Sequence, residues 1–228
     1  MLLEVHPLLR YRCLVLDHDD TTVDSTRAVN YPQFLEALAR YRPQLSISEE
    51  EFFRYCYDPG FYAMCDQVLH YTPEELAGHV AMWKTYHQTH HPRFFPGIPA
   101  LLARQRAAGG LYCVVSHSDD DVIAAAYQEA GVPLPDLIFG AEQPPERRKP
   151  NPWPLEEIMR RFSLTPADIL VVDDMPHGAQ MARAVGVTFA GAGWYGMLPD
   201  IEEKMRPQCD VFFPTVESFA AYLFPEAE

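Results

Sequence analysis

The sequence predicts a protein of the α/β class, with a parallel sheet covered by helices on both faces and an all-helical cap domain inserted into it. From about residue 94 onward, apolar strand-like runs alternate with segments of helical periodicity. This alternation is typical of a parallel sheet between two helical layers. Between residues 26 and 93 the pattern is helical, without a strong strand signal.

Short apolar runs mark the expected strands. They lie at residues 11–16, 111–115, 136–140, 169–172, 187–190 and 211–213. Helical stretches between them are expected at 98–108, from the acidic run 119–121 to Gly131, at 154–162 and at 178–185. The core domain is therefore assigned to residues 1–25 and 94–228, and the cap to residues 26–93.

The cap region carries clear helix-start signatures. Ser48 with Glu51, and Thr72 with Glu75, match the capping box, in which the two side chains bind backbone N–H groups of the first turn. The second helix is expected to continue to about residue 90. Residues 31–40 repeat apolar side chains at helical spacing.

Composition argues against two classes of partner. The chain has 228 residues, 48% of them hydrophobic, which suffices for a substantial core. A net charge of −14 argues against a nucleic-acid partner or an anionic membrane. Five cysteines without a C-x-x-C pair suggest reduced thiols and a cytoplasmic location. No signal-peptide core or membrane-span pattern is recognisable. The sequence leaves the oligomeric state open.

Polar side chains gather where three of the expected strands end: residues 17–20, residues 116–118, and Asp173 with Asp174. The carboxyl ends of parallel strands form the ligand site of such sheets, so these groups are expected to meet. Two adjacent carboxylates are tolerable when a cation lies between them or one is protonated. Acidic turns are common without any chemistry, but three such strand ends together with Lys149 in a basic loop favour a functional site.

These motifs resemble the haloacid dehalogenase superfamily, and specifically its phosphoglycolate phosphatase-like members with a helical C1 cap. Residues 17–21 match the D-x-D-x-T motif, Ser116 the motif ending the second strand, and Lys149-Pro150 the lysine motif. Asp173-Asp174 match the acidic motif. The resemblance covers about residues 12–222 and implies a three-layer Rossmann-like core with the cap inserted after the first motif.

The resemblance implies Mg²⁺-dependent hydrolysis of a small phosphorylated metabolite, a phosphomonoester. Asp17 is the expected nucleophile, forming an aspartyl-phosphate, and Asp19 the general acid and base. Lys149 is expected to offset the charge of Asp17 and of the phosphoryl oxygens. The phosphate contacts implied are Ser116, Thr21, His117 and Lys149. The Mg²⁺ ligands implied are Asp17, Asp19, Asp174 and Asp173. In the cap, Arg27, Arg54 and Lys84 are candidates to contact an anionic substrate.

Some positions depart from the family pattern. Asp20 stands where glycine is usual, Thr22 replaces an apolar residue, and Gly178 occupies a position that often carries a second acid. Two alternatives stay open. One is a phosphomutase of the same fold, and the other is a catalytically weak phosphate-binding or regulatory protein.

Overall fold

A computed structural model describes residues 9–225, and its centre is a six-stranded parallel sheet with the order β5-β4-β1-β6-β7-β8. The strands are β1 (Cys13–Leu16), β4 (Leu111–Val115), β5 (Ile138–Phe139), β6 (Ile169–Asp173), β7 (Thr188–Ala192) and β8 (Val211–Phe213). All side chains of β1 and β6 are buried, as expected for strands covered on both faces.

The register of the central strands aligns their carboxyl ends. Leu16 pairs with Val114 on one side and with Val172 on the other. Asp17 and Asp173 follow the two paired residues Leu16 and Val172, so they leave the sheet at the same level. The position of both carboxylates is therefore a direct consequence of strand pairing.

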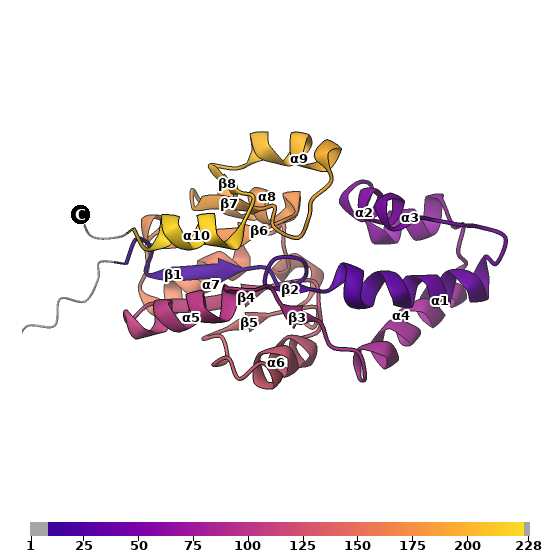
Figure 1. Cartoon of the computed structure of the whole chain (residues 1–228), viewed down its shortest axis with the longest axis horizontal. Helices are drawn as coiled ribbons and strands as arrows, with labels where there is room; N and C mark the ends of the chain where they lie inside the picture. The colour runs from indigo at the N-terminus through magenta and orange to yellow at the C-terminus, as the bar shows by residue number, and fades with distance from the viewer. Residues whose placement is uncertain (1–8, 226–228) are drawn as a thin grey trace, which may run out of the picture.

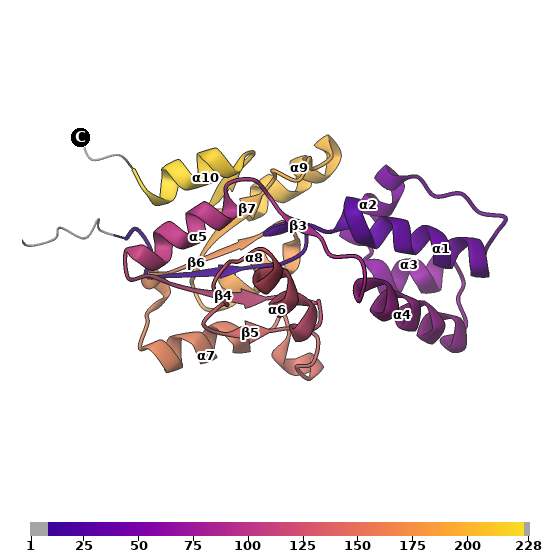
Figure 2. The same ribbon diagram turned by 60° about the horizontal axis from the view of Figure 1, so that its bottom comes forward.

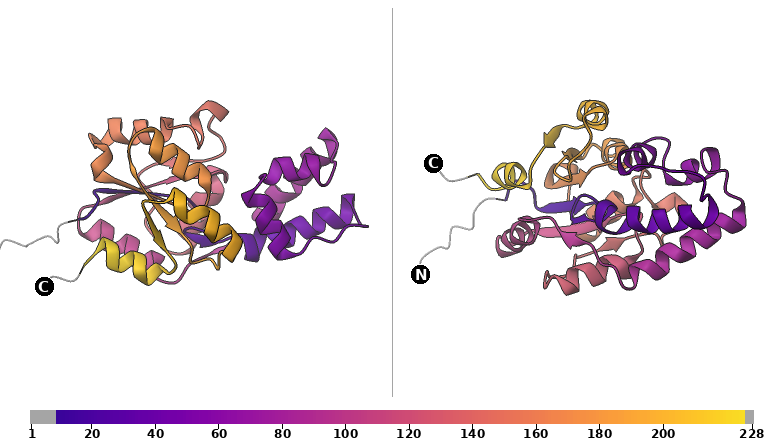
Figure 3. Two further views of the ribbon diagram at one scale, coloured as in Figure 1. Left: turned by 90° about the horizontal axis from the view of Figure 1, so that it is seen from above. Right: turned by 45° about the vertical axis from the view of Figure 1, so that its right-hand side comes forward.

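Helices cover both faces of the sheet. Their bounds are α5 (Ile98–Ala107), α6 (Asp120–Glu129), α7 (Trp153–Phe162), α8 (Pro176–Ala184), α9 (Pro199–Met205) and α10 (Val216–Leu223). The views agree that α5 and α10 lie together on one face and α7 and α8 on the other (Figures 1 and 3). Short 3₁₀ turns lie at Pro145–Arg147, Pro166–Asp168 and Arg206–Gln208. The prediction of an α/β fold with a parallel sheet and a helical insertion is confirmed.

The helical insertion lies beyond the carboxyl end of β1 (Figures 1 and 2). The chain leaves through β2 (Val23–Asp24) and returns through β3 (Arg93–Phe94), which pair antiparallel. Between them lie a π-helical turn, η1 (Thr26–Asn30), and the helices α1 (Tyr31–Tyr41), α2 (Glu49–Tyr57), α3 (Phe61–Gln67) and α4 (Pro73–His87). These helices enclose a separate hydrophobic cluster that includes Phe34, Phe52 and Met64. The exact division into cap and core domains stays a prediction.

Local sequence signals located several elements well and missed others. Both capping boxes form as predicted, at Ser48 and Thr72. The predicted strand at 136–140 shrinks to two residues, and α8 begins at Pro176, two residues before the predicted start. The helix after Thr72 ends at His87 rather than near residue 90. The helices α3, α9 and α10 and the short β2–β3 ribbon carry no sequence signal that predicted them.

The sequence also led us to expect reduced cysteines and no membrane-spanning segment. All five cysteines are free thiols. Within residues 9–225, none of the helices combines the length and the apolar character that crossing a membrane requires.

The separate cluster of the helical insertion should make its stability depend on Phe34, which has no exposed side-chain surface. We expect Phe34→Ala to lower the free energy of unfolding by about 3–5 kcal/mol, because it leaves a cavity among packed rings. Leu35→Ala on the same helix is the matched control, since Leu35 is 40% exposed. Urea titrations followed by circular dichroism measure both. Equal losses for the two variants would contradict the proposed packing.

Candidate functional site

Lys149 and Asp17 form the centre of the site. Lys149 Nζ lies 2.7 Å from Asp17 Oδ1 and 2.7 Å from Asp173 Oδ2. The contact with Asp173 is a hydrogen bond. Oδ1 of Asp17 has no donor in hydrogen-bond orientation, so its contact with the ammonium is an ion pair without that directionality. Lys149 is the only buried lysine or arginine among residues 9–225.

Asp173 is fixed on both of its oxygens. Oδ2 accepts from Lys149, and Oδ1 accepts from the backbone N–H of Met175 at 2.8 Å. Helix α8 then passes directly over the carboxylate, and a Cβ at Gly178 would lie 2.5 Å from both Cβ and Oδ2 of Asp173. The missing side chain at Gly178 is thus what makes room for the acid at Asp173. These two positions depend on each other.

Asp17, Asp173 and Asp174 form a possible cation site. Each offers a carboxylate oxygen, these oxygens all lie within 4.8 Å of one another, and all three residues are buried. The hydroxyl of Thr21 donates to Asp174 Oδ1 at 3.3 Å, which links the loop after β1 to the end of β6. An all-oxygen, anionic donor set fits a hard divalent cation.

Burial, together with the crowding of negative charge, raises the pKa values of two acids in the cluster. Burial raises the pKa of Asp17 to about 6, although Lys149 opposes the shift. Burial also raises the pKa of Asp174 well above its ordinary value, and the charges of Asp173, Asp17 and Asp20 add to that effect. Burial alone would lower the pKa of Lys149, but Asp17 and Asp173 outweigh it and hold the lysine protonated. One ammonium is too little for these carboxylates, so protons or a further cation must balance the rest.

Asp19 is held by a residue that sequence analysis did not assign. Ser118 Oγ donates to Asp19 Oδ2 at 2.5 Å. Burial acts to raise the pKa of Asp19, but His18 and the Ser118 hydrogen bond lower it below its ordinary value. Because burial lowers the pKa of His18 itself and keeps the imidazole neutral, we assign the lowering to Ser118. The polar ending Ser116-His117-Ser118 contained the signal for this residue.

Ser116 and His117 take different positions. The Ser116 side chain is buried, and its Oγ accepts from the N–H of Ser118 at 3.2 Å, which leaves the hydroxyl proton free to donate elsewhere. The exposed His117 bonds through Nε2 to the carbonyl of Lys149 at 3.0 Å. In this arrangement His117 supports the lysine loop from outside.

Asp20 adopts a left-handed backbone conformation, with φ of 53°. Aspartate reaches this region more easily than most side chains, which explains how it replaces glycine. Burial raises the pKa of Asp20 to about 7, even though its carboxylate accepts a hydrogen bond from the backbone of Thr26.

The cationic side chains considered for substrate contacts are engaged elsewhere. Arg54 of α2 pairs with Asp200 of α9 at 2.9 Å, and Lys84 of α4 pairs with Asp119 beside α6 at 2.9 Å. Arg27 bonds to Glu49 and to the carbonyl of Tyr195. In this structure these groups hold the helical insertion against the core. Trp194, which sequence analysis did not identify, donates from Nε1 to the carbonyl of Thr21 at 3.0 Å.

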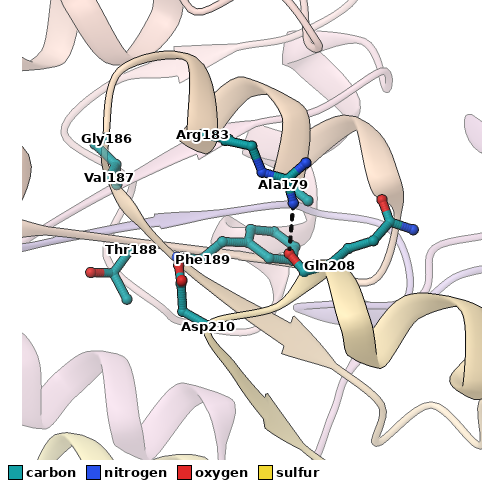
Figure 4. Close-up of a pocket in the computed structure, with 8 residues that line it drawn as sticks. All are labelled: Ala179, Arg183, Gly186, Val187, Thr188, Phe189, Gln208 and Asp210. Carbon is teal, nitrogen blue, oxygen red and sulfur yellow. Dashed lines mark hydrogen bonds between the residues drawn. The ribbon is translucent and has the colours of Figure 1, made fainter.

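A separate groove of about 380 Å³ lies at the opposite edge of the sheet, where β7 begins (Figure 4). Arg183 of α8 donates across it to the carbonyl of Gln208 at 3.4 Å, and Asp210 accepts from the N–H of Phe189. Its lining includes none of the carboxylates around Lys149. The chemistry-bearing groups are thus at the other end of the strands.

Comparison with known proteins gives consistent results. A phosphoglycolate phosphatase of Nitrosospira multiformis is 29% identical over 126 residues, 54% of each chain. Hexitol phosphatase A of Escherichia coli is 32% identical over 91 residues, 40% of this chain and 42% of that protein. The matched regions therefore span about half of these relatives or less.

A solved structure of a putative haloacid dehalogenase-like hydrolase from Bacteroides fragilis superposes with a TM-score of 0.76. It covers 92% of this chain and 99% of its own length at 21% identity, so the likeness concerns the fold. The family model of the haloacid dehalogenase-like hydrolases matches residues 14–192. Because this match includes most of the chain and every acid of the cluster around Lys149, the protein belongs to the haloacid dehalogenase-like hydrolases.

Proposed function

We propose that the protein is a Mg²⁺-dependent phosphatase that hydrolyses a small-molecule phosphomonoester through an aspartyl-phosphate on Asp17. The observation that carries the proposal is the buried ion pair between Asp17 and Lys149 within an acidic cluster at the carboxyl edge of the sheet. Such a pair keeps a carboxylate ionised where burial would otherwise protonate it, and an ionised carboxylate is what a nucleophile requires.

In the first step, a carboxylate oxygen of Asp17 attacks phosphorus. The new O–P bond forms as the bond between phosphorus and the leaving oxygen breaks, and Asp19 gives that oxygen its proton. Asp19 must be protonated at this stage, whereas the Ser118 hydrogen bond favours its ionised form. The negative charge of the arriving phosphoryl group raises the pKa of Asp19 and so favours the protonated form that this step needs.

In the second step, water hydrolyses the aspartyl-phosphate. Asp19, now ionised, takes a proton from the attacking water, and the O–P bond to Asp17 breaks to release phosphate. Lys149 and the free hydroxyl proton of Ser116 offset charge on the phosphoryl oxygens. Thr21 acts through Asp174, to which it donates, and His117 acts through the Lys149 loop.

Mg²⁺ is the cation best suited to the oxygen-only donor set. Asp17 and Asp174 would hold it, together with the carbonyl of Asp19, and Asp173 would contribute mainly by fixing Lys149. When bound, the ion supplies positive charge that neutralises phosphoryl oxygens.

The relatives named as phosphatases of phosphoglycolate and of hexitols support a small phosphorylated metabolite as the substrate. Phosphate release should therefore be screened with phosphorylated carboxylic acids, polyols and sugars in parallel. Product analysis with a sugar phosphate also separates a phosphatase from a phosphomutase, because only the phosphatase releases free phosphate.

Replacing the nucleophile gives the most direct test. We expect Asp17→Asn to reduce release of p-nitrophenol from p-nitrophenyl phosphate to background, because the amide cannot form the phosphoryl intermediate. The exposed Asp66 provides the control, and Asp66→Asn should keep wild-type turnover. Acid quenching with radiolabelled substrate should trap label on the wild-type protein only. Unchanged turnover in Asp17→Asn would refute the assigned nucleophile.

The acidic cluster predicts that stabilisation by Mg²⁺ grows with pH. The pKa of Asp17, about 6 when folded, and that of Asp174, which is raised well above its usual range, both lie above the ordinary value of 3.8. Between about pH 4 and 7 the folded state thus binds more protons than the unfolded state, so this contribution to stability is lost as pH rises. Mg²⁺ binds the ionised cluster, so its effect is larger when the protons have left.

Melting temperatures of chelator-treated protein, with and without Mg²⁺, measure this linkage. We expect a larger increase at about pH 7.5 than at about pH 5. Asp174→Asn should lose most of the increase at both values. An increase that is independent of pH in the wild-type protein would show that the cation does not bind this cluster.

The contact between Gly178 and Asp173 predicts an unfavourable glycine-to-alanine change. In most helix interiors this change stabilises by up to about 1 kcal/mol. Here the added Cβ meets Asp173 at 2.5 Å, and we expect a net loss of about 1–2 kcal/mol together with reduced turnover. Gln180→Ala on the exposed face of α8 is the control. A Gly178→Ala protein with wild-type stability and activity would refute the dependence of Asp173 on Gly178.

A further inference from the structure

Asp20 is a carboxylate of the loop after β1 that the proposed chemistry does not use. Its side chain is only 5% exposed, and it lies between Asp19 and Thr21, which both take part in the site. A buried carboxylate is costly unless its hydrogen-bonding capacity is used. The hydrogen bonds that the buried carboxylate of Asp20 accepts therefore indicate its structural role.

The carboxylate of Asp20 reaches forward to the start of the helical insertion. Oδ1 accepts a hydrogen bond from the backbone N–H of Thr26 at 3.0 Å. Thr26 is the first residue of η1, and the first N–H groups of a helix have no partner within the helix. Asp20 supplies that partner from outside the helix.

This bond bypasses the β2–β3 ribbon. The loop between β1 and β2 is closed by N–H groups of Thr22 and Val23, which both donate to the carbonyl of His18. The ribbon then pairs Val23 with Phe94 and Asp24 with Arg93. The insertion is thus connected to the core through the ribbon and, in addition, through the Asp20–Thr26 bond, which starts one residue after Asp19.

We propose that Asp20 is a positioning residue that fixes the first turn of the helical insertion to the loop carrying Asp17 and Asp19. Movement of η1 relative to the core then pulls on the backbone next to Asp19, so the placement of the insertion and of the acid–base carboxylate are coupled. The kinetic part of this proposal rests on the proposed phosphatase function, whereas the structural part does not.

The left-handed backbone at Asp20 allows a clean set of variants. Glycine adopts this conformation freely but offers no acceptor, while asparagine tolerates it and keeps a carbonyl acceptor. Asp20→Gly therefore removes the bond to Thr26 without backbone strain. Asp20→Asn retains a weaker, uncharged version of the bond.

Native-state amide exchange of the full-length protein tests the bond directly. We expect the Thr26 amide to exchange about tenfold faster or more in Asp20→Gly than in the wild type, with Asp20→Asn in between. The amide of Val171 in β6 reports global stability and should change much less. Unchanged Thr26 exchange in Asp20→Gly, or equal acceleration at Val171, would overturn the proposal.

Kinetics test the coupling to Asp19. An alkyl phosphate needs a proton on its leaving oxygen, whereas p-nitrophenolate leaves without one. In Asp20→Gly the ratio of kcat for an alkyl phosphate to kcat for p-nitrophenyl phosphate should fall about tenfold. An unchanged ratio with accelerated Thr26 exchange would overturn the coupling. A wild-type protein without turnover would refute the phosphatase proposal, while the exchange data would still decide the role of Asp20.

Discussion

The buried ammonium of Lys149 is the interaction on which the site depends. Bringing Asp17 and Asp173 to the same edge of the sheet is a result of strand register, and both carboxylates are removed from water. Neither ionised acid would be tolerated there alone, because desolvating a charge costs several kcal/mol. Lys149 contacts both at 2.7 Å and is itself kept charged by them. The lysine loop and the two strand ends are therefore mutually required.

The same balance explains a departure from the family pattern. With an acid at Asp173, the space beside it cannot hold a side chain on α8, and Gly178 leaves that space free. A carboxylate at Gly178 would compete for the volume that Asp173 occupies. The glycine at position 178 and the acid at position 173 are thus required by each other. This arrangement keeps a second carboxylate beside Lys149.

Sequence patterns were most informative where local rules apply. Strands β1, β4 and β6 are continuous apolar runs, and the capping boxes at Ser48 and Thr72 form as the spacing indicates. The groups that meet around Lys149 were found because they follow these strands. The short helices α3 and α9 are two turns long, and their stability comes mainly from packing that no local signal records.

Side-chain partners were harder to predict than positions. The hydrogen bond from Ser118 to Asp19 spans 99 positions of the sequence, and the one from Trp194 to the carbonyl of Thr21 spans 173. Their geometry is set by loops whose course depends on the whole sheet. The capture of the Thr26 N–H by Asp20 spans only six residues, yet it requires the left-handed turn that a sequence does not reveal.

The helical insertion contacts the core through two ion pairs and one pair of aromatic rings. The ion pairs Arg54–Asp200 and Lys84–Asp119 each include a side chain that is more than 40% exposed. Such pairs contribute about 0–1 kcal/mol each and are weakened by salt. Phe53 of α2, by contrast, is buried against Tyr195 in the hydrophobic cluster of the core, and burying such a side chain contributes about 1.5–3 kcal/mol.

The two ion pairs can therefore be broken and remade at little cost. The ribbon of β2 and β3 and the bond from Asp20, by contrast, are hydrogen bonds of partly buried backbone groups, and breaking them leaves polar atoms without partners. We therefore expect the insertion to move about the connection at Thr26. Such a rotation would change the distance between the insertion and the carboxylates, and in the proposed mechanism it would therefore control the access of water to the aspartyl-phosphate.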